Sequence, residues 1–350
     1  MFRLIKKLLL AVLAAALLVG LSAWAYVHSL HLEREPKANP QANASVLGFA
    51  GKPTGSGRIL AVVSSAPALL DGSPTGFELT ELSRAWWVFV GNGFQVDIAS
   101  PAGGTAPMRK DDLIDADYAF LNDPVAQASL KATLRLADVD ASQYRAIYFV
   151  GGKGAMLDFY RNAEIQRLLQ DIAPRGVVGA VCHGPAALLD VRLATGELLL
   201  KNKTVTGFSN VEEHMLMKNP ISKLGFMLQN QLSDQAIQYS EGPMYLKHVV
   251  TSGNVITGQN PWSTWQVAEQ MVVALGHEPI VRRITAEEAS VEILLSYRAR
   301  GLQAAVQTQA QQMQDRQVVR DKKLILMHAV VAAMNGKLGD ALALARLAGN

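Results

Sequence analysis

The stretch GVVGAVCHGPAALL, residues 176–189, constrains the fold of this chain more than any other. Its first half contains an apolar run over residues 177–181, which is too short for a helix and has the length of a buried strand. Gly184 and Pro185 then favour a sharp turn into a helix, because glycine has no Cβ to obstruct the turn and proline suits the first helical position. Cys182, the only cysteine, lies at this turn. We predict a buried strand that presents Cys182 at its carboxyl end.

A thiol at such a turn is well placed for nucleophilic chemistry. The turn lifts the side chain out of the sheet and aims the first helical N–H groups, with the positive end of the helix dipole, at the same point. Helix N-termini and nearby cations favour a thiolate, so we expect Cys182 to ionise more easily than a free cysteine. The alternative is that Cys182 is only a small buried apolar residue. The flanking small residues and the adjacent His183 favour the nucleophile.

The first residues predict a membrane segment. Residues 1–7 contain three basic residues and precede an uncharged apolar run over residues 8–27, close to the roughly 20 apolar residues that cross a bilayer. Basic residues before the run predict a cytoplasmic N-terminus and a body on the other side. We therefore expect a single-pass helix in the cell inner membrane, with the catalytic domain facing the periplasm. The alternative is secretion after cleavage of a signal sequence, because Ala-Trp-Ala at 23–25 resembles a cleavage site.

Charge gives no indication of nucleic-acid binding. The net charge of +3 comes from the three basic residues of the predicted membrane segment, and the rest of the chain balances its 30 acidic residues with an equal number of basic ones. No basic tract interleaved with aromatic residues occurs in the sequence. Residues 28–57 are rich in Pro, Asn, Gly and Ser without periodicity and are expected to form a linker.

Strands and helices alternate along residues 58–283. Helical spacing of apolar residues covers 78–90 and 162–172, and apolar runs of strand length lie at 59–63, 94–99, 146–150, 177–181, 204–206, 248–251 and 255–257. Strands that are almost wholly apolar and alternate with helices indicate an α/β fold, with a mostly parallel sheet covered on both faces. In such sheets the reactive site lies beyond the carboxyl ends of the strands.

Gly151 and Gly152 follow the predicted strand 146–150, at the same edge of the sheet as Cys182. Glycine N–H groups approach a developing oxyanion without steric obstruction, so these two and the N–H of His183 are candidates for an oxyanion or substrate-binding site. The alternative is an ordinary turn at a strand end, which also prefers glycine.

Several segments resemble the ThiJ/PfpI superfamily, which has the flavodoxin-like, class I glutamine amidotransferase-like fold. They are AVCHGPAALL at 180–189, YFVGGKGAMLDF at 148–159, TGFSNVEE at 206–213 and VITGQNP at 255–261. Two earlier segments are similar to the branch of large heat-shock chaperones and glyoxalase III enzymes, namely TGFELTEL at 75–82 and VDIASPAGGTAP at 96–107.

The resemblance implies catalytic roles. Cys182 corresponds to the nucleophile, His183 to the adjacent base, and Glu81 to an acidic residue that hydrogen-bonds the sulfur in its protonated form. The third member of the triad is an acid after the predicted strand 204–206, for which Glu212 is our choice and Glu213 the alternative. A carboxylate orients an imidazole and stabilises its charged form, whereas burial beside a thiolate raises the pKa of a carboxyl.

The resemblance also implies an activity. We expect a glyoxalase III-like lyase or hydratase that converts methylglyoxal to lactate, with a small dicarbonyl as substrate and without glutathione or another cofactor. The alternatives are a holdase-type stress chaperone and an amidase or peptidase of the same fold. Trp86-Trp87 replaces the usual Pro-aromatic pair and Lys153 replaces a common histidine, which leaves the substrate open. The histidines are isolated, with His214 the one candidate ligand, so we predict no metal.

Residues 284–350 differ in character from the predicted α/β domain. Residues 286–316 are rich in Ala, Glu, Gln and Arg with apolar residues at helical spacing, and helices are expected at 322–334 and 338–347. We predict a helical C-terminal extension that packs on the core or on a neighbouring subunit of a homo-oligomer.

Overall fold

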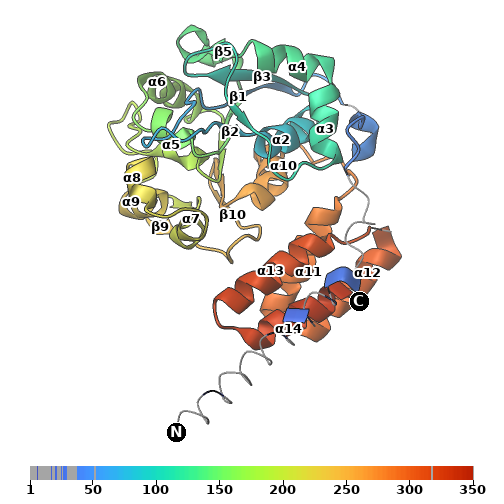
Figure 1. The fold of residues 1–350 in the computed structure, drawn as a ribbon. Coiled ribbons are helices and arrows are strands. Elements are labelled where there is room, and N and C mark those ends of the chain that lie inside the picture. Colours follow the sequence, from blue (N-terminus) through green and yellow to red (C-terminus); the bar gives the residue numbers. More distant parts are fainter. Residues whose placement is uncertain are drawn as a thin grey trace. The chain divides into compact units, whose positions relative to one another are not determined.

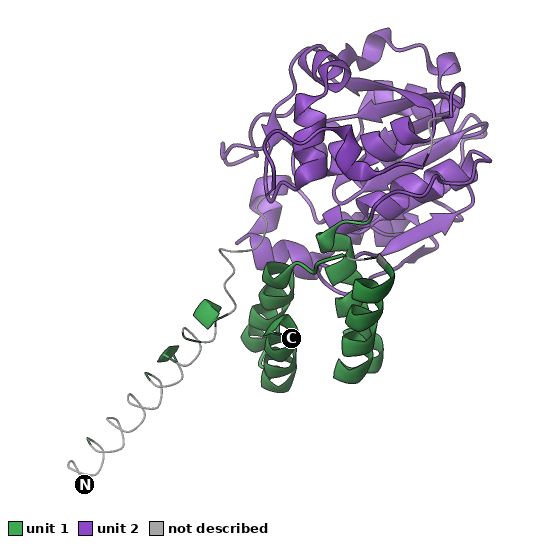
Figure 2. Cartoon of the chain, turned by 90° about the vertical axis from the view of Figure 1, so that its right-hand side faces the viewer, with its two compact units in different colours: residues 1–37, 284–350 green, residues 38–283 purple. Residues whose placement is uncertain are grey.

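The computed structural model describes residues 38–50, 53–316 and 318–349, together with eight single residues among the first 37. Contacts between residues divide the chain into two compact units (Figure 2). The larger unit comprises residues 38–283, and the smaller comprises residues 284–350 together with 1–37.

A seven-stranded sheet forms the centre of the larger unit (Figure 1). The strand order is β10-β11-β7-β6-β1-β3-β5. All neighbouring strands are parallel except β10, which runs antiparallel to β11. The mostly parallel sheet expected from the sequence is thus confirmed. The strands are β1 (Gly57–Val62), β3 (Phe94–Ser100), β5 (Leu134–Arg135), β6 (Ala146–Phe149), β7 (Val177–Val181), β10 (Val249–Ser252) and β11 (Val255–Gly258).

Two short pairs of strands lie outside this sheet. The strand predicted at 204–206 is β8 (Thr204–Val205), but it pairs with β9 (Gln238–Tyr239) and is not part of the central sheet. The other pair, β2 (Phe77–Glu78) and β4 (Met108–Arg109), is parallel, and β2 leads directly into α2 (Leu79–Gly91).

Helices cover both faces of the sheet. The connection from β1 to β3 through α2 and the connection from β6 to β7 through α6 (Ala163–Ile172) run in opposite directions along the sheet. Because such crossovers are right-handed, α2 and α6 lie on opposite faces, as Figure 1 shows. The helix α10 (Thr264–Ala274) packs on α2 and β7. All residues of β6 and β7 are therefore buried.

The larger unit also contains several shorter helices. They are α3 (Asp115–Asn122), α4 (Pro124–Lys131), α5 (Ala155–Asp158), α7 (Asn210–Leu216), α8 (Pro220–Leu224) and α9 (Leu228–Gln235), with the 3-10 helices η2 (Ala44–Leu47), η3 (Leu136–Asp138), η4 (Ala141–Gln143), η5 (Gly184–Leu188) and η6 (Pro261–Ser263).

Residues 38–50, which lie in the predicted linker, belong to the larger unit and pack on its helices. The backbone N–H of Asn39 donates to Asp115 Oδ1 at 2.7 Å, and the Asn122 side chain donates to the carbonyl of Ala42 at 2.9 Å. Leu47 in η2 is buried. This segment is therefore structured, because a single buried leucine and a few specific hydrogen bonds fix it where composition suggested only a spacer.

The predicted membrane anchor is corrected by the structure. Among the described residues, no helix has both the length and the apolar character needed to cross a bilayer. Most of the predicted segment 8–27 lies outside the described residues. The transmembrane helix, the membrane as a partner and the inner-membrane location with a periplasmic domain are accordingly withdrawn.

The smaller unit contains two helical hairpins. The region 286–316 is not continuous, because Gly301, with φ +83°, separates α11 (Ala286–Arg300) from α12 (Leu302–Arg316). The second hairpin is formed by α13 (Lys322–Met334) and α14 (Leu338–Gly349). The hydroxyl of Tyr297 donates to Asp340 Oδ1 at 2.8 Å and joins the hairpins. Thr285 begins α11 with a capping box to Glu288.

Candidate active site

Cys182 lies at a strained turn directly after β7. Its φ of +59° is in the left-handed region, which costs a non-glycine residue free energy unless the surroundings enforce it. Here they do, since the N–H of Cys182 donates to the carbonyl of Gly258 at 2.9 Å and its carbonyl accepts the N–H of Phe208 at 2.8 Å. Gly184 completes the turn, because a Cβ there would collide with the Phe149 carbonyl. The predicted elbow is thus present.

The element after the elbow differs from the expected helix. It is η5, a 3-10 helix of five residues. A single turn of this kind carries little of the macrodipole that a long α-helix provides. The helix dipole therefore offers weak support for a thiolate, and side chains around the sulfur decide its titration.

His183 connects the thiol to a carboxylate. Its Nδ1 lies 3.3 Å from Cys182 Sγ, and its Nε2 lies 2.7 Å from Glu213 Oε2. The imidazole stacks on the Phe208 ring with centroids 4.5 Å apart. Both ring nitrogens are engaged and the ring plane is fixed, which is the geometry of a base that takes the thiol proton while a carboxylate stabilises the resulting imidazolium.

The carboxylate on His183 belongs to Glu213, whereas the sequence favoured Glu212. Glu212 Oε2 accepts hydrogen bonds from the backbone and hydroxyl of Ser209, and Glu212 Oε1 accepts from Tyr245 N at 2.8 Å and from Asn260 Nδ2 at 2.9 Å. Successive residues of a helix point about 100° apart, so only one of the two glutamates faces the imidazole.

The pKa of Glu213 is lowered. Burial alone would raise it, but the charge and hydrogen bond of His183 in its protonated form outweigh burial, and Lys153 and His214 act in the same direction. Glu213 is therefore ionised although only 4% of its surface is exposed, as the acid of such a triad requires.

Glu81 lies on the other side of the sulfur. Its Oε2 accepts the N–H of Gly151 at 2.7 Å, and its carboxyl interacts with the Cys182 thiol. The side chain is completely buried. Burial and, next, the charge of Glu78 raise the pKa of Glu81 well above its usual range. Glu81 thus holds a proton beside the sulfur.

The titration of Cys182 differs from the expectation of easy ionisation. Burial raises the pKa of the thiol well above its usual range, and the neighbouring acids Glu81 and Glu78 add to this. The N–H of Gly152 acts in the opposite direction. Loss of the proton from either the thiol or the Glu81 carboxyl makes it harder for the other to lose its proton. The thiolate of Cys182 therefore forms only when a base such as His183 accepts the thiol proton.

The two candidate oxyanion glycines have different environments. The N–H of Gly151 is already bound by Glu81 and is not available to a substrate oxygen. The N–H of Gly152 faces the sulfur. Neither position has room for a side chain, because a Cβ on Gly151 would meet Glu81 and one on Gly152 would lie 2.5 Å from the Gly76 carbonyl. The oxyanion role of Gly152 stays a prediction.

Glu78 also belongs to this site, although it is absent from the sequence-based site residues. Its charge acts on Glu81 and Cys182, and it is acted on by Lys153, His183 and others. Burial, followed by the charge of Asp111, raises its pKa. Its position three residues before Glu81 was a usable signal, since residues so spaced share one face of a helix.

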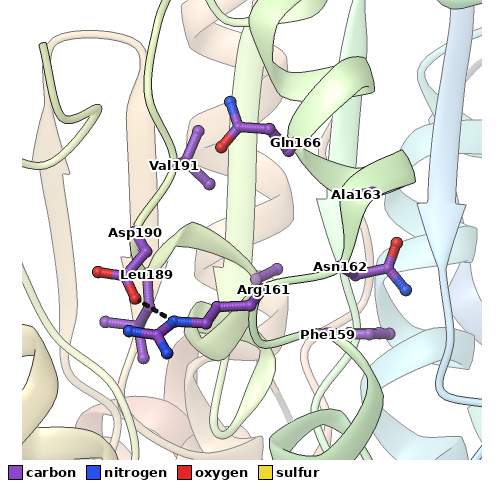
Figure 3. A pocket seen from close by; sticks show the side chains of 9 residues that line it. Phe159, Arg161, Asn162, Ala163, Gln166, Leu189, Asp190 and Val191 are labelled. Carbon is purple, nitrogen blue, oxygen red and sulfur yellow. Dashed lines mark hydrogen bonds and ion pairs between the residues drawn. The ribbon is translucent and has the colours of Figure 1, made fainter. Parts of the chain in front are cut away.

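Within the described part of the chain, no group of three or more His, Cys, Asp or Glu side chains is placed to hold a metal ion. A cavity of about 200 Å³ lies beside the start of α6, where Arg161 Nε donates to Asp190 Oδ2 at 2.7 Å (Figure 3). Cys182 and His183 do not line this cavity.

Comparisons with known proteins find relatives that cover the α/β unit of this chain. The chain is 29% identical over 219 residues to Glyoxalase 3 of Candida albicans, covering 58% of this chain and 91% of that protein. It is 31% identical over 222 residues to Glutathione-independent glyoxalase HSP31 of Saccharomyces cerevisiae, covering 59% of this chain and 91% of that protein.

Solved structures of similar proteins cover the same α/β part of this chain. The crystal structure of glyoxalase III from Candida albicans matches with a TM-score of 0.58 and 27% identity, covering 63% of this chain and 98% of that one. Rapid Encystment Protein 24 KDa of Francisella tularensis matches with a TM-score of 0.58 and 32% identity, covering 63% and 99%. The model of the DJ-1/PfpI family matches residues 72–274. This chain belongs to the DJ-1/PfpI family.

Proposed function

We propose that this protein is a glutathione-independent glyoxalase that converts a 2-oxoaldehyde and water to a 2-hydroxy acid, as methylglyoxal to lactate. The observation that carries the proposal is the arrangement at the strained elbow, with His183 Nδ1 3.3 Å from the sulfur of Cys182 and a buried, protonated Glu81 beside it. The glyoxalases among the relatives support the same reaction.

The first step is addition of sulfur to the aldehyde. His183 accepts the thiol proton, and Glu213 stabilises the imidazolium through the 2.7 Å contact. The sulfur attacks the aldehyde carbon, an S–C bond forms, and the carbonyl oxygen takes up a proton to give a hemithioacetal. A raised thiol pKa keeps the free enzyme in the thiol form, so its nucleophile is generated only during turnover.

The second step moves a proton between adjacent carbons. A base removes the proton from the carbon bound to sulfur, forming an enediol, and a proton is delivered to the neighbouring carbon. The product is a thioester of the 2-hydroxy acid. Glu81 is suited to this transfer, because a carboxyl with a raised pKa is both an effective acid and, once deprotonated, an effective base. Water then hydrolyses the thioester, releasing the acid and restoring the thiol.

The test is lactate formation from methylglyoxal without added thiol. We expect the wild type to form lactate and both Cys182→Ala and Cys182→Ser to lose turnover. Glu197→Gln is the matched control, since this residue is exposed and pairs with Lys201 away from the site. Equal lactate formation by Cys182→Ala and wild type would rule out the thiol mechanism.

A further inference from the structure

The loop Gly151–Gly154 carries a single side chain larger than hydrogen, that of Lys153. The loop is fixed around it. Gly151 N is bound by Glu81, Gly152 packs on the Gly76 carbonyl, and a Cβ on Gly154 would meet the Ser64 hydroxyl. The backbone of the half-buried Lys153 is therefore fixed beside the site, because the glycines around it have no room to shift.

The ammonium of Lys153 lies near both acidic sides of the site. Its charge acts on Glu78 at the start of α2 and on Glu213 in the first turn of α7. These two residues flank the Cys182–His183 pair, since Glu78 acts on the thiol and Glu213 binds the imidazole. Lys153 therefore belongs to a loop beside the sulfur, since a Cβ on Gly151, two residues earlier in the same loop, would lie 2.7 Å from Cys182 Cβ.

Other residues also interact with these two glutamates, although the charge of Lys153 acts on Glu78 more strongly than that of Arg109. Glu213 is bound to His183 at 2.7 Å. Glu78 is the register partner of Arg109 in the β2–β4 pair, and Arg109 also lies 3.5 Å from Asp111. Within the described residues, Lys153 has no ion pair shorter than 4.0 Å and no hydrogen bond from its ammonium. Lys153 is thus the cation whose donors are left for a ligand.

We propose that Lys153 is a specificity-determining residue that binds the carboxylate of an anionic 2-oxoaldehyde, so that the enzyme prefers such substrates to neutral methylglyoxal. The inference rests on the proposed function. When Cys182 bonds the aldehyde carbon, a carboxylate at the other end of the substrate reaches the ammonium, which offers three donors on a flexible stem. Glu78 opposes this preference, because its carboxylate repels an anion in proportion to its ionisation.

The primary test is the alkylation of Cys182 by iodoacetate and by iodoacetamide. In both reactions an S–C bond forms, a C–I bond breaks and iodide leaves, so the reagents differ mainly in charge. The ratio of their second-order rate constants cancels the fraction of thiolate. We expect Lys153→Met to lower the iodoacetate-to-iodoacetamide ratio by about three- to tenfold, Lys153→Arg to retain it, and Glu78→Gln to raise it.

The matched control is Lys131→Met, which removes an exposed lysine at the end of α4. Its charge is not among those that act on Glu78, Glu213 or Cys182. An unchanged ratio in Lys153→Met, or the same change in Lys131→Met, would overturn the proposal. Circular dichroism of each variant confirms that the ratio is measured on folded protein.

Turnover separates this inference from the proposed function. The probe is 4,5-dioxopentanoate, a 2-oxoaldehyde with a carboxylate, compared with methylglyoxal. We expect a higher kcat/KM for the anionic substrate in the wild type, and a loss of that preference in Lys153→Met through KM. If both substrates are converted equally well by wild type and variant, the inference fails and the glyoxalase stands. If neither is converted but the alkylation ratio falls, the glyoxalase fails and anion selection by Lys153 is supported.

Discussion

The start of α2 brings two carboxyls, Glu78 and Glu81, toward Cys182, whereas the start of α7 brings only Glu213 toward it through His183, and Glu212 binds elsewhere. Glu81 on α2 and Glu213 on α7 are both almost completely buried. Yet the pKa of Glu81 is raised well above its usual range, whereas the pKa of Glu213 is lowered. Equal burial with opposite shifts means that neighbouring charge, and not solvent exclusion alone, assigns each carboxyl its protonation state.

The neighbours explain the difference. Burial raises the pKa of Glu213, but the hydrogen bond and charge of His183, whose Nε2 lies 2.7 Å away, outweigh burial and lower it. Burial and then the charge of Glu78 raise the pKa of Glu81, and the hydrogen bonds with Cys182 and the Gly151 N–H and the charge of Arg84 lower it only partly. One residue is thereby kept as an acid and the other as a carboxylate, which is the separation that acid–base catalysis at neutral pH requires.

Replacing Glu213 should give the largest effect on activity. We expect Glu213→Gln to lower kcat/KM for methylglyoxal by about 10²- to 10⁴-fold, because the imidazolium loses its ionic partner. Steady-state kinetics, with Glu197→Gln as the exposed control, measures this. Near-wild-type activity in Glu213→Gln would mean that catalysis does not need the carboxylate on His183. The different protonation states of Glu81 and Glu213 would then have no role in catalysis.

Glu212 should affect stability more than chemistry. Its carboxylate accepts hydrogen bonds from Ser209, Tyr245 and Asn260 and is fully buried. We expect Glu212→Ala to lower the free energy of unfolding by about 3–5 kcal/mol, since several buried donors lose their acceptor. Urea denaturation measures the loss. A kcat close to wild type at low temperature would separate Glu212 from Glu213, whereas a stable but inactive variant would reverse their roles.

Much of this site was predictable from the sequence. The elbow around Cys182 and the parallel sheet follow from short apolar runs bounded by glycine and proline, which are local signals. The choice between Glu212 and Glu213 also had a local signal, because Ser209 and Glu212 have the S-x-x-E spacing of a capping box. That pattern predicts that Glu212 caps the N-terminus of α7, so that Glu213 is the residue that can bind His183.

Other features could not be predicted from local sequence. The N–H of Gly151 is bound by Glu81, which is 70 residues away in the chain. The raised pKa of Cys182 depends on burial beneath loops from several strands and on Glu81 and Glu78 together. Such properties arise from tertiary packing, which periodicity and composition do not encode.

The contributions of Glu81 and Glu213 to the free energy of unfolding should depend on pH in opposite directions. A lowered pKa means that Glu213 contributes stability above its ordinary value of 4.5, lost as pH falls through the folded value. A raised pKa means that Glu81 contributes stability below 4.5, lost as pH rises toward its folded value. The stability of wild type relative to Glu213→Gln should therefore rise with pH, whereas the wild type should become less stable than Glu81→Gln as pH rises above 4.5.

Urea denaturation of the three proteins across a pH series measures both slopes. Glutamine has nearly the shape of a protonated glutamate, so wild type and Glu81→Gln should converge in acid, where both side chains are neutral. Slopes of the same sign for the two variants would show that burial alone determines both carboxyls, which contradicts the assignment of an acid and a carboxylate.

The smallest expected effect on stability comes from the N-terminal capping of the helices α2 and α7. At α7, Ser209 caps the helix through Glu212 N, whereas at α2 the N-cap residue Glu78 makes no side-chain cap and its N–H donates to the Gly151 carbonyl. We expect Ser209→Ala to cost about 1 kcal/mol of unfolding free energy, the usual value of a lost cap. Its kcat should stay near wild type, because Glu212 still binds Tyr245 and Asn260 and so keeps the turn that aims Glu213. A loss of kcat larger than the loss of stability would mean that the cap itself orients Glu213, and that α7, like α2, depends on a neighbour to place its carboxylate.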